Sequence, residues 1–241
     1  MSRDIEIRDG AFIVSDAHYS PNRPQFLSFL KKILGEELKT TQLILAGDMF
    51  DALFGGVSYT YELNKEAVDV LNKISLNIEV IYLEGNHDFN LKNIFPNIKI
   101  FPISVQPVKC KIKDKSILLA HGDIKSTLKY RLYTAVIRNP FVLYILKTID
   151  IISGHYILKK VDDHLSKKDD CKEISGFEDF INNRLSDMYK SDYFIEGHFH
   201  QDKTFTMKDS IYINLGAFAC NQRYFIVELS NGIKFLQEKF S

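Results

Sequence analysis

The sequence predicts an α/β fold in which two facing mixed β-sheets are flanked by helices. Up to residue 85, short apolar runs alternate with amphipathic stretches of helical period, which is the rhythm of a mostly parallel sheet. From residue 108 onward, further apolar runs are separated by turn residues and predict a second set of strands. We therefore expect one domain over residues 1–241, with a helical insertion at about 125–170.

The amino-terminal part of the chain supplies the strands and helices of the first sheet. The apolar runs at 10–16, 42–48 and 78–85 have the length of buried strands, and each ends in polar residues. Between these runs, 24–34 and 61–75 carry apolar side chains at helical spacing. Strands and helices that alternate in this order favour parallel pairing through crossover connections.

The pattern changes in the remainder of the chain. Residues 108–123 predict a β-hairpin that turns at Lys113-Asp114-Lys115. The insertion at about 125–170 is helical in pattern, and a further helical stretch follows near 174–190. Several short strands then continue toward the end of the chain. We find no repeat or linker that divides the sequence into independent domains.

The composition is that of an ordinary globular protein without a global charge. Hydrophobic residues make up 45% of the chain, and Lys+Arg and Asp+Glu number 31 each. We therefore expect no nucleic-acid partner, and no obligate protein partner is indicated. The chain has neither a signal peptide nor a run of roughly 20 apolar residues. These features predict a cytoplasmic protein, and contact with the cytoplasmic face of the inner membrane stays open.

The three cysteines, Cys110, Cys171 and Cys220, are widely spaced. They form no CxxC pair and are odd in number, so they indicate neither a zinc ribbon nor a disulfide framework. We expect each cysteine to be a buried apolar side chain in a reducing compartment.

Five polar clusters stand at the carboxyl ends of apolar runs. They are Asp16-Ala17-His18, Gly47-Asp48-Met49-Phe50-Asp51, Gly85-Asn86-His87-Asp88, His121-Gly122-Asp123 and Gly197-His198-Phe199-His200. Any one of them alone is more often a turn or a surface polar group. Ligand sites of α/β sheets gather at the carboxyl ends of strands, so five such clusters in series predict one site.

Spacing and residue type point to two metal ions at this site. Asp16 and His18 are separated by one residue, so in an extended segment both side chains point the same way. His198 and His200 repeat this spacing. Asp48 supplies a carboxylate that can bridge two ions. Two such ions, roughly 3.5–4 Å apart, activate a bridging water for in-line attack on phosphorus.

The predicted ligands are nitrogen and oxygen donors without a thiolate. The seven candidates are Asp16, His18, Asp48, Asn86, His121, His198 and His200. This donor set suits Mn²⁺, Fe or Zn²⁺ rather than a structural zinc cluster. We expect two divalent ions, with Mn²⁺ the first choice.

The motifs D-x-H, G-D-x-x-D, G-N-H-D, H-G-D and G-H-x-H, in this order, resemble those of the calcineurin-like metallophosphoesterase superfamily. The resemblance covers positions 16 to 200 and implies the fold of that superfamily and a metal-dependent hydrolase of phosphoesters or pyrophosphates. It implies that one ion is held by Asp16, His18, Asp48 and His200, with Asp48 bridging. It implies that the second ion is completed by Asn86, His121 and His198.

The resemblance also implies roles for the residues around Asn86. In the superfamily the histidine of G-N-H-D approaches the phosphate, where it stabilises developing charge or protonates the leaving oxygen. His87 is therefore the expected catalytic residue. Asp88 is expected to orient the His87 ring, and Asp51 to support the site without ligating.

The insertion resembles the segment that follows H-G-D in UDP-2,3-diacylglucosamine pyrophosphatases, which carry a similar tyrosine-rich helix and an R-N-P turn. The matching residues here are Tyr130, Tyr133, Arg138, Asn139 and Pro140. The resemblance implies cleavage of a nucleotide-activated glycolipid, UDP-2,3-diacylglucosamine, to lipid X and UMP in lipid A biosynthesis. It also implies that the insertion is a lid whose apolar face takes the acyl chains.

The residues of the insertion suit such a lid. The stretch 141–158 is highly apolar, and residues 125–170 carry nine positive and five negative side chains, a net charge of +4. A basic and apolar helical pair suits acyl chains, a diphosphate and an anionic membrane surface. The candidate substrate residues are Tyr130, Arg138, Lys159 and Lys160. The alternative is a core helix hairpin with a solvated lysine face.

Two departures from the glycolipid enzymes keep a second function open. Those enzymes typically carry arginine where this chain has His87, and the acidic pair that follows their H-G-D motif is missing here. The alternative is a soluble metallophosphoesterase, a phosphodiesterase or phosphomonoesterase, acting on another small phosphoester or nucleotide. A non-catalytic scaffold on the same fold is disfavoured, because every ligand position is filled.

Overall fold

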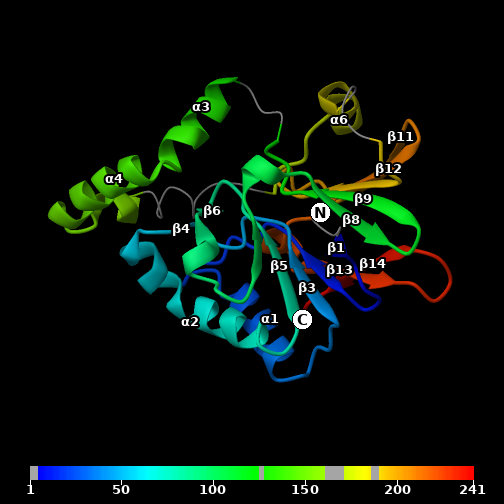
Figure 1. Ribbon diagram of the computed structural model, residues 1–241, viewed down its shortest axis with the longest axis horizontal. Helices are drawn as coiled ribbons and strands as arrows, with labels where there is room; N and C mark the ends of the chain where they lie inside the picture. Colours follow the sequence, from blue (N-terminus) through cyan, green and yellow to red (C-terminus); the bar gives the residue numbers. More distant parts are fainter. Residues whose placement is uncertain (1–4, 125–127, 161–170, 186–189) are drawn as a thin grey trace.

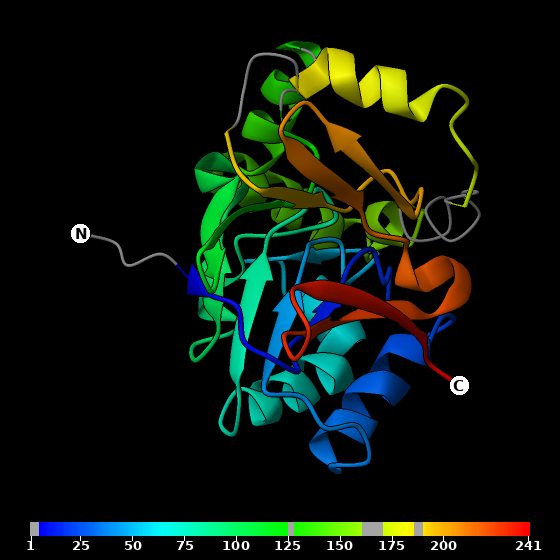
Figure 2. The same ribbon diagram turned by 90° about the vertical axis from the view of Figure 1, so that its right-hand side faces the viewer.

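Two six-stranded β-sheets face each other and carry helices on their outer sides, as Figure 1 and Figure 2 show. The computed structural model describes residues 5–124, 128–160, 171–185 and 190–241. In spatial order, the first sheet is formed by β14 (Lys234–Lys239), β13 (Arg223–Glu228), β2 (Phe12–Val14), β3 (Gln42–Leu45), β5 (Glu79–Leu83) and β7 (Lys99–Phe101). The second is formed by β1 (Ile5–Glu6), β8 (Val108–Ile112), β9 (Lys115–Ala120), β10 (Tyr193–Glu196), β12 (Ser210–Asn214) and β11 (Lys203–Met207).

The helices complete four layers in the order αββα. Those that pack on the sheets are α1 (Gln25–Leu34), α2 (Ser58–Ile74), α6 (Phe177–Leu185) and the short α7 (Phe218–Asn221). The smaller elements are β4 (Leu53–Phe54), β6 (Asp88–Phe89), η1 (Leu91–Asn93) and η2 (Ile103–Val105). This arrangement confirms the predicted α/β class with two facing mixed sheets.

The predicted alternation of strands and helices is confirmed in the first sheet. β2, β3, β5 and β7 pair in parallel, and the register sets Val14 beside Leu45 and Leu45 beside Tyr82. β8 and β9 form the predicted antiparallel hairpin. The predicted helix near 174–190 is α6, and residues 186–189 lie outside the described part of the chain.

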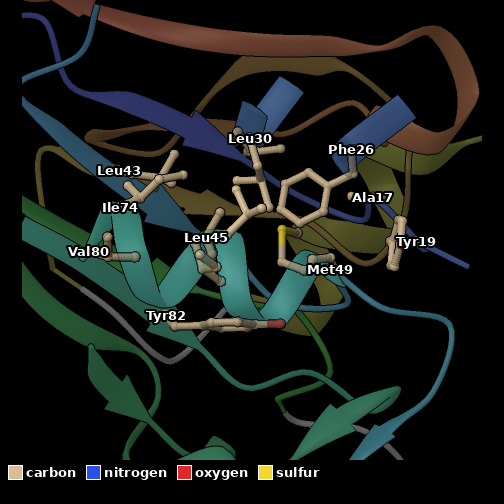
Figure 3. Close-up of a cluster of buried hydrophobic side chains, with 14 of the residues drawn as sticks. Ala17, Tyr19, Phe26, Leu30, Leu43, Leu45, Met49, Ile74, Val80 and Tyr82 are labelled. Atoms are coloured by element: carbon tan, nitrogen blue, oxygen red, sulfur yellow. The ribbon is translucent and has the colours of Figure 1, made fainter. Parts of the chain in front are cut away.

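Alternating side chains of each strand build two separate apolar layers. In β3, Leu43 and Leu45 face α1 and α2, whereas Ile44 faces the second sheet. Figure 3 shows Leu43 and Leu45 meeting Leu30 of α1 in the layer under the helices. A strand buried on both faces reads as a continuous apolar run, which is why these strands were visible in the sequence.

The cysteines correct a prediction. Cys110 is buried, as expected, but Cys171 and Cys220 form a disulfide. Their 49-residue separation hides this pairing from sequence spacing. The disulfide ties the segment before α6 to α7, and the backbone N–H of Ala219 in α7 donates to the carbonyl O of Asp16. The disulfide therefore lies close to one of the predicted metal ligands.

A helical segment at 128–160 extends away from the sheets in Figure 1. It contains α3 (Leu128–Ile137), α4 (Pro140–Ile152) and helical residues 156–160. The ends of the predicted insertion, 125–127 and 161–170, lie outside the described residues. No helix in the described part of the chain has the length and apolar character that a membrane span requires.

The helical segment 128–160 is anchored at its middle. The side chain of Asn139 accepts hydrogen bonds from the first N–H groups of α4, and Pro140 occupies the first turn, where its missing N–H costs nothing. Leu143 of α4 packs on Val57 and Phe89 of the body. Only a small part of this segment is therefore core.

Candidate metal centre

The carboxyl ends of strands from both sheets meet at one edge of the molecule. Asp16 and Asp48 follow the neighbouring parallel strands β2 and β3. His121 and His198 follow β9 and β10, which pair in parallel so that Ala120 lies beside Glu196. Parallel pairing places these loops side by side, because parallel strands all end at the same edge.

One candidate ligand group, here called site A, consists of Asp16, His18 and His200. Their donor atoms all lie within 4.8 Å of one another. The Nε2 atom of His200 is 3.1 Å from Oδ1 of Asp16, and the side chains are buried or nearly so. Three nitrogen and oxygen donors at this spacing suit a single divalent ion.

A second group, site B, consists of Asp48, His121 and His198, whose donor atoms also lie within 4.8 Å of one another. The Nε2 atom of His121 is 3.3 Å from Oδ2 of Asp48. Nδ1 of His121 lies 3.0 Å from the carbonyl O of Ala46, which can only accept a proton. This contact places the imidazole proton on Nδ1 and leaves the Nε2 lone pair for a cation.

Two further atoms fit the presence of ions at these sites. The amide Oδ1 of Asn86 and the Nε2 atom of His18 are buried without a hydrogen-bond partner. Buried polar atoms nearly always have a hydrogen-bond partner. The unpaired Oδ1 of Asn86 and the unpaired Nε2 of His18 are therefore candidate metal-binding atoms. The division into sites A and B agrees with the one that the family resemblance implies, and the complete ligand set stays a prediction.

The electrostatics of the two sites favour cations. Burial raises the pKa of Asp16, but the charge and hydrogen bond of His200 outweigh burial and hold that pKa below its usual value. Burial also opposes ionisation of Asp48, yet His121 holds its pKa well below the usual range. Burial and the charge of His121 lower the pKa of His198 to about 3. Burial opposes protonation of His121, but Asp48 raises the pKa of His121 well above its usual value, so a metal ion would take the place of the Nε2 proton. Ionised carboxylates and neutral imidazoles are the forms that ligate metals.

The local backbone differs from the extended geometry expected for the D-x-H and H-x-H pairs. Asp16 (φ 52°), His18 (φ 44°), His198 (φ 66°) and His200 (φ 59°) all lie in the left-handed region. Asp48 (φ 54°) shares this conformation. Each such residue costs on the order of 1–3 kcal/mol and persists only when its surroundings impose it. The pairs still converge on one site, but through tight turns rather than strand alternation.

Two of the motif glycines are required by close approach. A Cβ atom on Gly47 would lie 2.4 Å from Nδ1 of His121, and the φ of Gly47 is +93°. A Cβ atom on Gly85 would lie 2.1 Å from Oδ1 of Asp48. Any side chain at either position would displace a predicted ligand, so both glycines serve the site as well as the turn.

His87 lies at the mouth of site A. Its ring stands edge-on to that of His18, with centroids 4.9 Å apart, and its backbone N–H donates to Oδ1 of Asp48. Nδ1 of His87 is 2.9 Å from the carbonyl O of Asp51. The prediction that Asp88 orients the His87 ring is therefore wrong, because the carbonyl of Asp51 contacts that ring instead. Asp51 also supports site A, because its Oδ1 lies 3.4 Å from Nδ1 of His18.

Asp88 instead organises the backbone beneath the ligands. Its Oδ1 accepts the N–H groups of Asp48 at 3.1 Å and Gly85 at 3.0 Å. Its Oδ2 accepts the N–H of Met49 and the hydroxyl of Tyr82, both at 2.6 Å. Burial and the charge of Asp48 raise the pKa of Asp88 to about 7. This carboxylate joins the loops after β3 and β5, and its role could not be read from a hexapeptide.

The four candidate substrate residues divide into two pairs. Arg138 donates from Nη2 to the carbonyl O of Gly85 at 2.7 Å, and the Tyr130 hydroxyl donates to Asp123 at 3.4 Å. Both therefore lie beside the metal centre. Nζ of Lys159 contacts the carbonyl O of Gly154, and Lys160 lies over the Tyr156 ring. These two lysines are exposed and bonded within their own segment.

The sequence profile of the calcineurin-like phosphoesterase family matches residues 11–202, the part of the chain that holds every predicted ligand. The chain belongs to this family. A calcineurin-like phosphoesterase with two such ligand groups is a metal-dependent phosphoester hydrolase, which confirms the enzyme class expected from the motifs. The family also implies divalent metal ions, for which sites A and B are the candidate positions.

Curated relatives of this phosphoesterase are named UDP-2,3-diacylglucosamine hydrolase. The protein from Pseudomonas fluorescens (strain Pf0-1) is 28% identical over 156 residues, which is 62% of this chain and 61% of that protein. The protein from Coxiella burnetii (strain Dugway 5J108-111) is 24% identical over 197 residues, 78% of this chain and 79% of that protein. The matched part of the first relative is thus less than two thirds of its length.

Two solved phosphoesterase structures align with the chain at low similarity. The E. coli phosphoesterase YfcE has a TM-score of 0.48 and 14% identity, and the match covers 96% of this chain and 99% of that one. An archaeal phosphodiesterase has a TM-score of 0.47 and 16% identity, covering 95% and 99%. The family assignment rests on the sequence profile rather than on these distant likenesses.

Sequence reasoning assigned no role to several residues at this calcineurin-like centre. Asp123, buried between Tyr130 and Arg138, stands in the H-G-D cluster and was within reach of motif reasoning. The roles of Tyr82 and of the Ala46 carbonyl could not be predicted from the sequence. Tyrosine is common in strands and every residue has a carbonyl oxygen, so neither feature marks a site. Contacts of this kind become visible only when the strands are paired.

Proposed function

We propose that this calcineurin-like phosphoesterase hydrolyses the pyrophosphate of UDP-2,3-diacylglucosamine, giving lipid X and UMP in lipid A biosynthesis. The names of relatives at 28% and 24% identity support this substrate class. Identity at this level does not specify the substrate, so the proposal depends on features of this chain.

One observation carries the proposal, namely the exposed apolar surface of the helical segment 128–160. Leu128, Phe141 and Ile152 are 70%, 71% and 81% exposed. Other large apolar side chains of the segment that face solvent are Leu132, Tyr133, Val136, Tyr144, Ile145, Leu146, Ile149, Ile151, Tyr156 and Ile157. Exposed apolar side chains in this number mark an interaction site, and acyl chains are their natural occupant beside a phosphoesterase centre.

The segment is attached to the metal centre at the point where a glycolipid head group would lie. The Arg138 side chain donates a hydrogen bond to the carbonyl O of Gly85, one residue before Asn86. Tyr130 holds Asp123, two residues after His121. In this proposal residues 125–170 are a lid insertion in a single domain spanning 1–241, with acyl chains on the helices and the diphosphate at sites A and B. Lys159 and Lys160 add positive charge for the nucleotide-linked phosphates.

The chemistry follows from the residues of the centre. Two bound divalent ions supply Lewis-acid chemistry: they polarise phosphoryl oxygens and make water a nucleophile at neutral pH. His87 acts on the leaving oxygen. Its Nδ1–H donates to the Asp51 carbonyl, so Nε2 is the atom left for the substrate. As an imidazolium, His87 would give the Nε2 proton to the leaving oxygen and return to the neutral form. Asp88 keeps Asp48 and Gly85 in register while this transfer occurs.

We further propose Mn²⁺ as the metal, since mixed histidine, carboxylate and amide ligands suit it. The same segment supports peripheral contact with the cytoplasmic face of the inner membrane. Its exposed apolar side chains and its net charge of +4 over 125–170 suit an anionic lipid surface, where a diacyl substrate resides.

One assay tests the substrate. Purified protein with Mn²⁺ receives UDP-2,3-diacylglucosamine beside bis-p-nitrophenyl phosphate, and the release of UMP and nitrophenol is measured. The proposal expects UMP release from the glycolipid to far exceed turnover of the aryl ester. Turnover of the aryl ester without any release of UMP from the glycolipid would rule out the glycolipid function.

A second candidate function is hydrolysis of another small phosphoester or nucleotide by the same centre. His87 favours it, since the glycolipid enzymes typically carry arginine at this position. UDP-glucosamine without acyl chains separates the two candidates. If the deacylated compound is cleaved as fast as the glycolipid, the apolar surface has no part in substrate selection and the second function stands.

A further inference from the structure

Arg184 of α6 connects two loops that are far apart in the sequence. Its side chain is 8% exposed. Nη1 donates to the carbonyl oxygens of Gly122 and Ile124, each at 3.1 Å. Nη2 donates to the carboxylate of Glu196, a fully buried residue at the end of β10. The guanidinium of Arg184 thus donates to the backbone of the loop after β9 and to the side chain of the last residue of β10.

These loops carry the two histidines of site B. Gly122 directly follows His121 after β9, and Glu196 stands two residues before His198 after β10. Arg184 is therefore bonded to residues one position from His121 and two positions from His198. No sequence motif pointed to it, because α6 follows the helical segment 128–160 and lies outside every polar cluster.

A buried network extends from this pair to the loop of His198. The Tyr212 hydroxyl donates to Oε1 of Glu196 at 2.6 Å. The Asn214 amide donates to the carbonyl oxygens of Glu196 at 3.1 Å and Gly197 at 2.8 Å. The N–H of Gly197 donates in turn to the carbonyl O of His121 at 2.7 Å. The spacing of the two histidine loops is thus held from several directions at once.

Stability alone gives a weak reason for a charged pair in this place. Desolvation of two buried charges often offsets their attraction, and apolar residues of similar volume commonly serve as well. An apolar side chain at position 184 would leave the carbonyls of Gly122 and Ile124 without this donor. What arginine provides here is a planar fork that fixes several acceptors relative to one another.

We propose that Arg184 and Glu196 are positioning residues that hold His121 and His198 at the separation required to share one divalent ion at site B. The inference rests on the proposed metal-dependent function, because it presumes that site B binds an ion. Site A takes two of its three ligands, Asp16 and His18, from the loop after β2 in the other sheet, and only His200 from the loop of His198, so the effect of the pair is larger at site B.

The test measures Mn²⁺ affinity, not turnover. The double variant Arg184→Met/Glu196→Gln removes both charges together and keeps an acceptor for Tyr212, so that no uncompensated charge stays buried. It is made in two backgrounds. His18→Ala disables site A and reports on site B, whereas His121→Ala disables site B and reports on site A. Calorimetric titration of each chelated protein with Mn²⁺ gives the affinity of the remaining site.

We expect the double variant to weaken Mn²⁺ binding about 10–100-fold in the His18→Ala background, the range typical of residues that support metal ligands. In the His121→Ala background the loss of affinity is clearly smaller, since His200 is the one ligand of site A in the loops that Arg184 and Glu196 hold. A matched control is Lys115→Met/Asp192→Asn, an ion pair at 2.8 Å that joins the opposite ends of the same strands, β9 and β10. It changes neither affinity.

Each outcome decides the matter. Unchanged affinity in the His18→Ala background, or equal loss in both backgrounds, overturns the inference in favour of a purely structural pair. Failure of the wild-type protein to bind Mn²⁺ overturns the proposed function instead. If the double variant is not recovered folded, Arg184→Lys takes its place, because it keeps a cation at Glu196 and loses the fork. The same loss, larger at site B than at site A, is then expected.

Discussion

The metal centre and the helical segment 128–160 both reverse the usual distribution of side chains. At the centre, carboxylates and imidazoles such as Asp16, Asp48 and His121 are buried. On the segment, apolar side chains such as Phe141 and Ile152 face solvent. Burial of a charge requires a partner of opposite charge, and exposure of a large apolar surface is unfavourable until it is covered. Each region is thus suited to a partner, a cation at the centre and, in the proposed function, an acyl chain on the segment.

The two regions differ in how they are held. Around the centre, buried networks from Asp88 and Arg184 tie every ligand loop to its neighbours. The segment touches the body through few side chains, among them Arg138 and Leu143. Reaction chemistry needs atoms positioned closely, whereas an apolar surface recognises flexible chains without fixed geometry. The predictions below separate what each region contributes.

The largest effect is expected at Asp48. Asp48→Ala removes the carboxylate predicted to bridge both ions, so metal binding and turnover fall together, by at least about 10⁴-fold in kcat/KM, because several kcal/mol of charge stabilisation are lost. Metal content and turnover of any accepted phosphoester are measured side by side. Asp69→Ala, at an exposed carboxylate of α2, is the control and changes neither. Retention of both ions in Asp48→Ala would contradict the ligand assignment.

His87 separates chemistry from metal binding within the centre. His87→Ala is expected to keep both ions and to lose about a thousandfold in kcat, the scale of general acid–base catalysis. Metal analysis and steady-state kinetics on the same preparation test this. Loss of an ion would show that His87 is a ligand.

The helical segment is tested by Leu132→Ser/Val136→Ser, two exposed positions one turn apart on α3. Losing two apolar contacts with acyl chains lowers kcat/KM for the glycolipid about 10–100-fold, since each change removes the equivalent of one or two buried methylene groups at about 0.8 kcal/mol each. Turnover of the aryl ester stays unchanged, as does stability. Equal loss for both substrates would remove the contrast between the two regions.

Asp88 tests the rigidity of the centre. Asp88→Asn replaces an acceptor-only carboxylate with an amide that repels at least one of the N–H groups of Asp48, Met49 and Gly85. We expect a loss of about 1–3 kcal/mol in the free energy of unfolding, the usual result of leaving buried donors unpaired. Urea unfolding measures it, and Asp69→Asn is the control. An unchanged unfolding curve would show that the network adapts.

The smallest effect is expected far from both regions, at Asp192. The hydrogen bonds of Lys115 and Ser116 hold the pKa of Asp192 below its usual value. A carboxylate with a lowered folded-state pKa stabilises the protein fully above its unfolded pKa of 3.8, and the contribution is lost as pH falls through the lowered folded-state pKa. Asp192→Asn should therefore lower stability slightly at about pH 6 and less at about pH 2. Equal stability of variant and wild type at both values would refute the shift.

The strand ends and their ligands were open to sequence reasoning because both signals are local. A buried strand reads as a continuous apolar run, and Asp16, Asp48 and His121 follow such runs directly. Parallel pairing then brings them together without further information. The expected extended backbone at Asp16 and His18 was wrong, because turn conformations imposed by the surrounding loops do not appear in spacing.

The sequence by itself determined the fold class, the family and the residues that face the metal centre, since periodicity and motif order are properties of short stretches. Only the tertiary structure decided that Asp88 binds backbone rather than His87, that Cys171 meets Cys220, and that Arg184 reaches both histidine loops of site B. Each of these is a contact between segments that are distant along the chain. Such partners are chosen by strand pairing and layer packing, which no local pattern specifies.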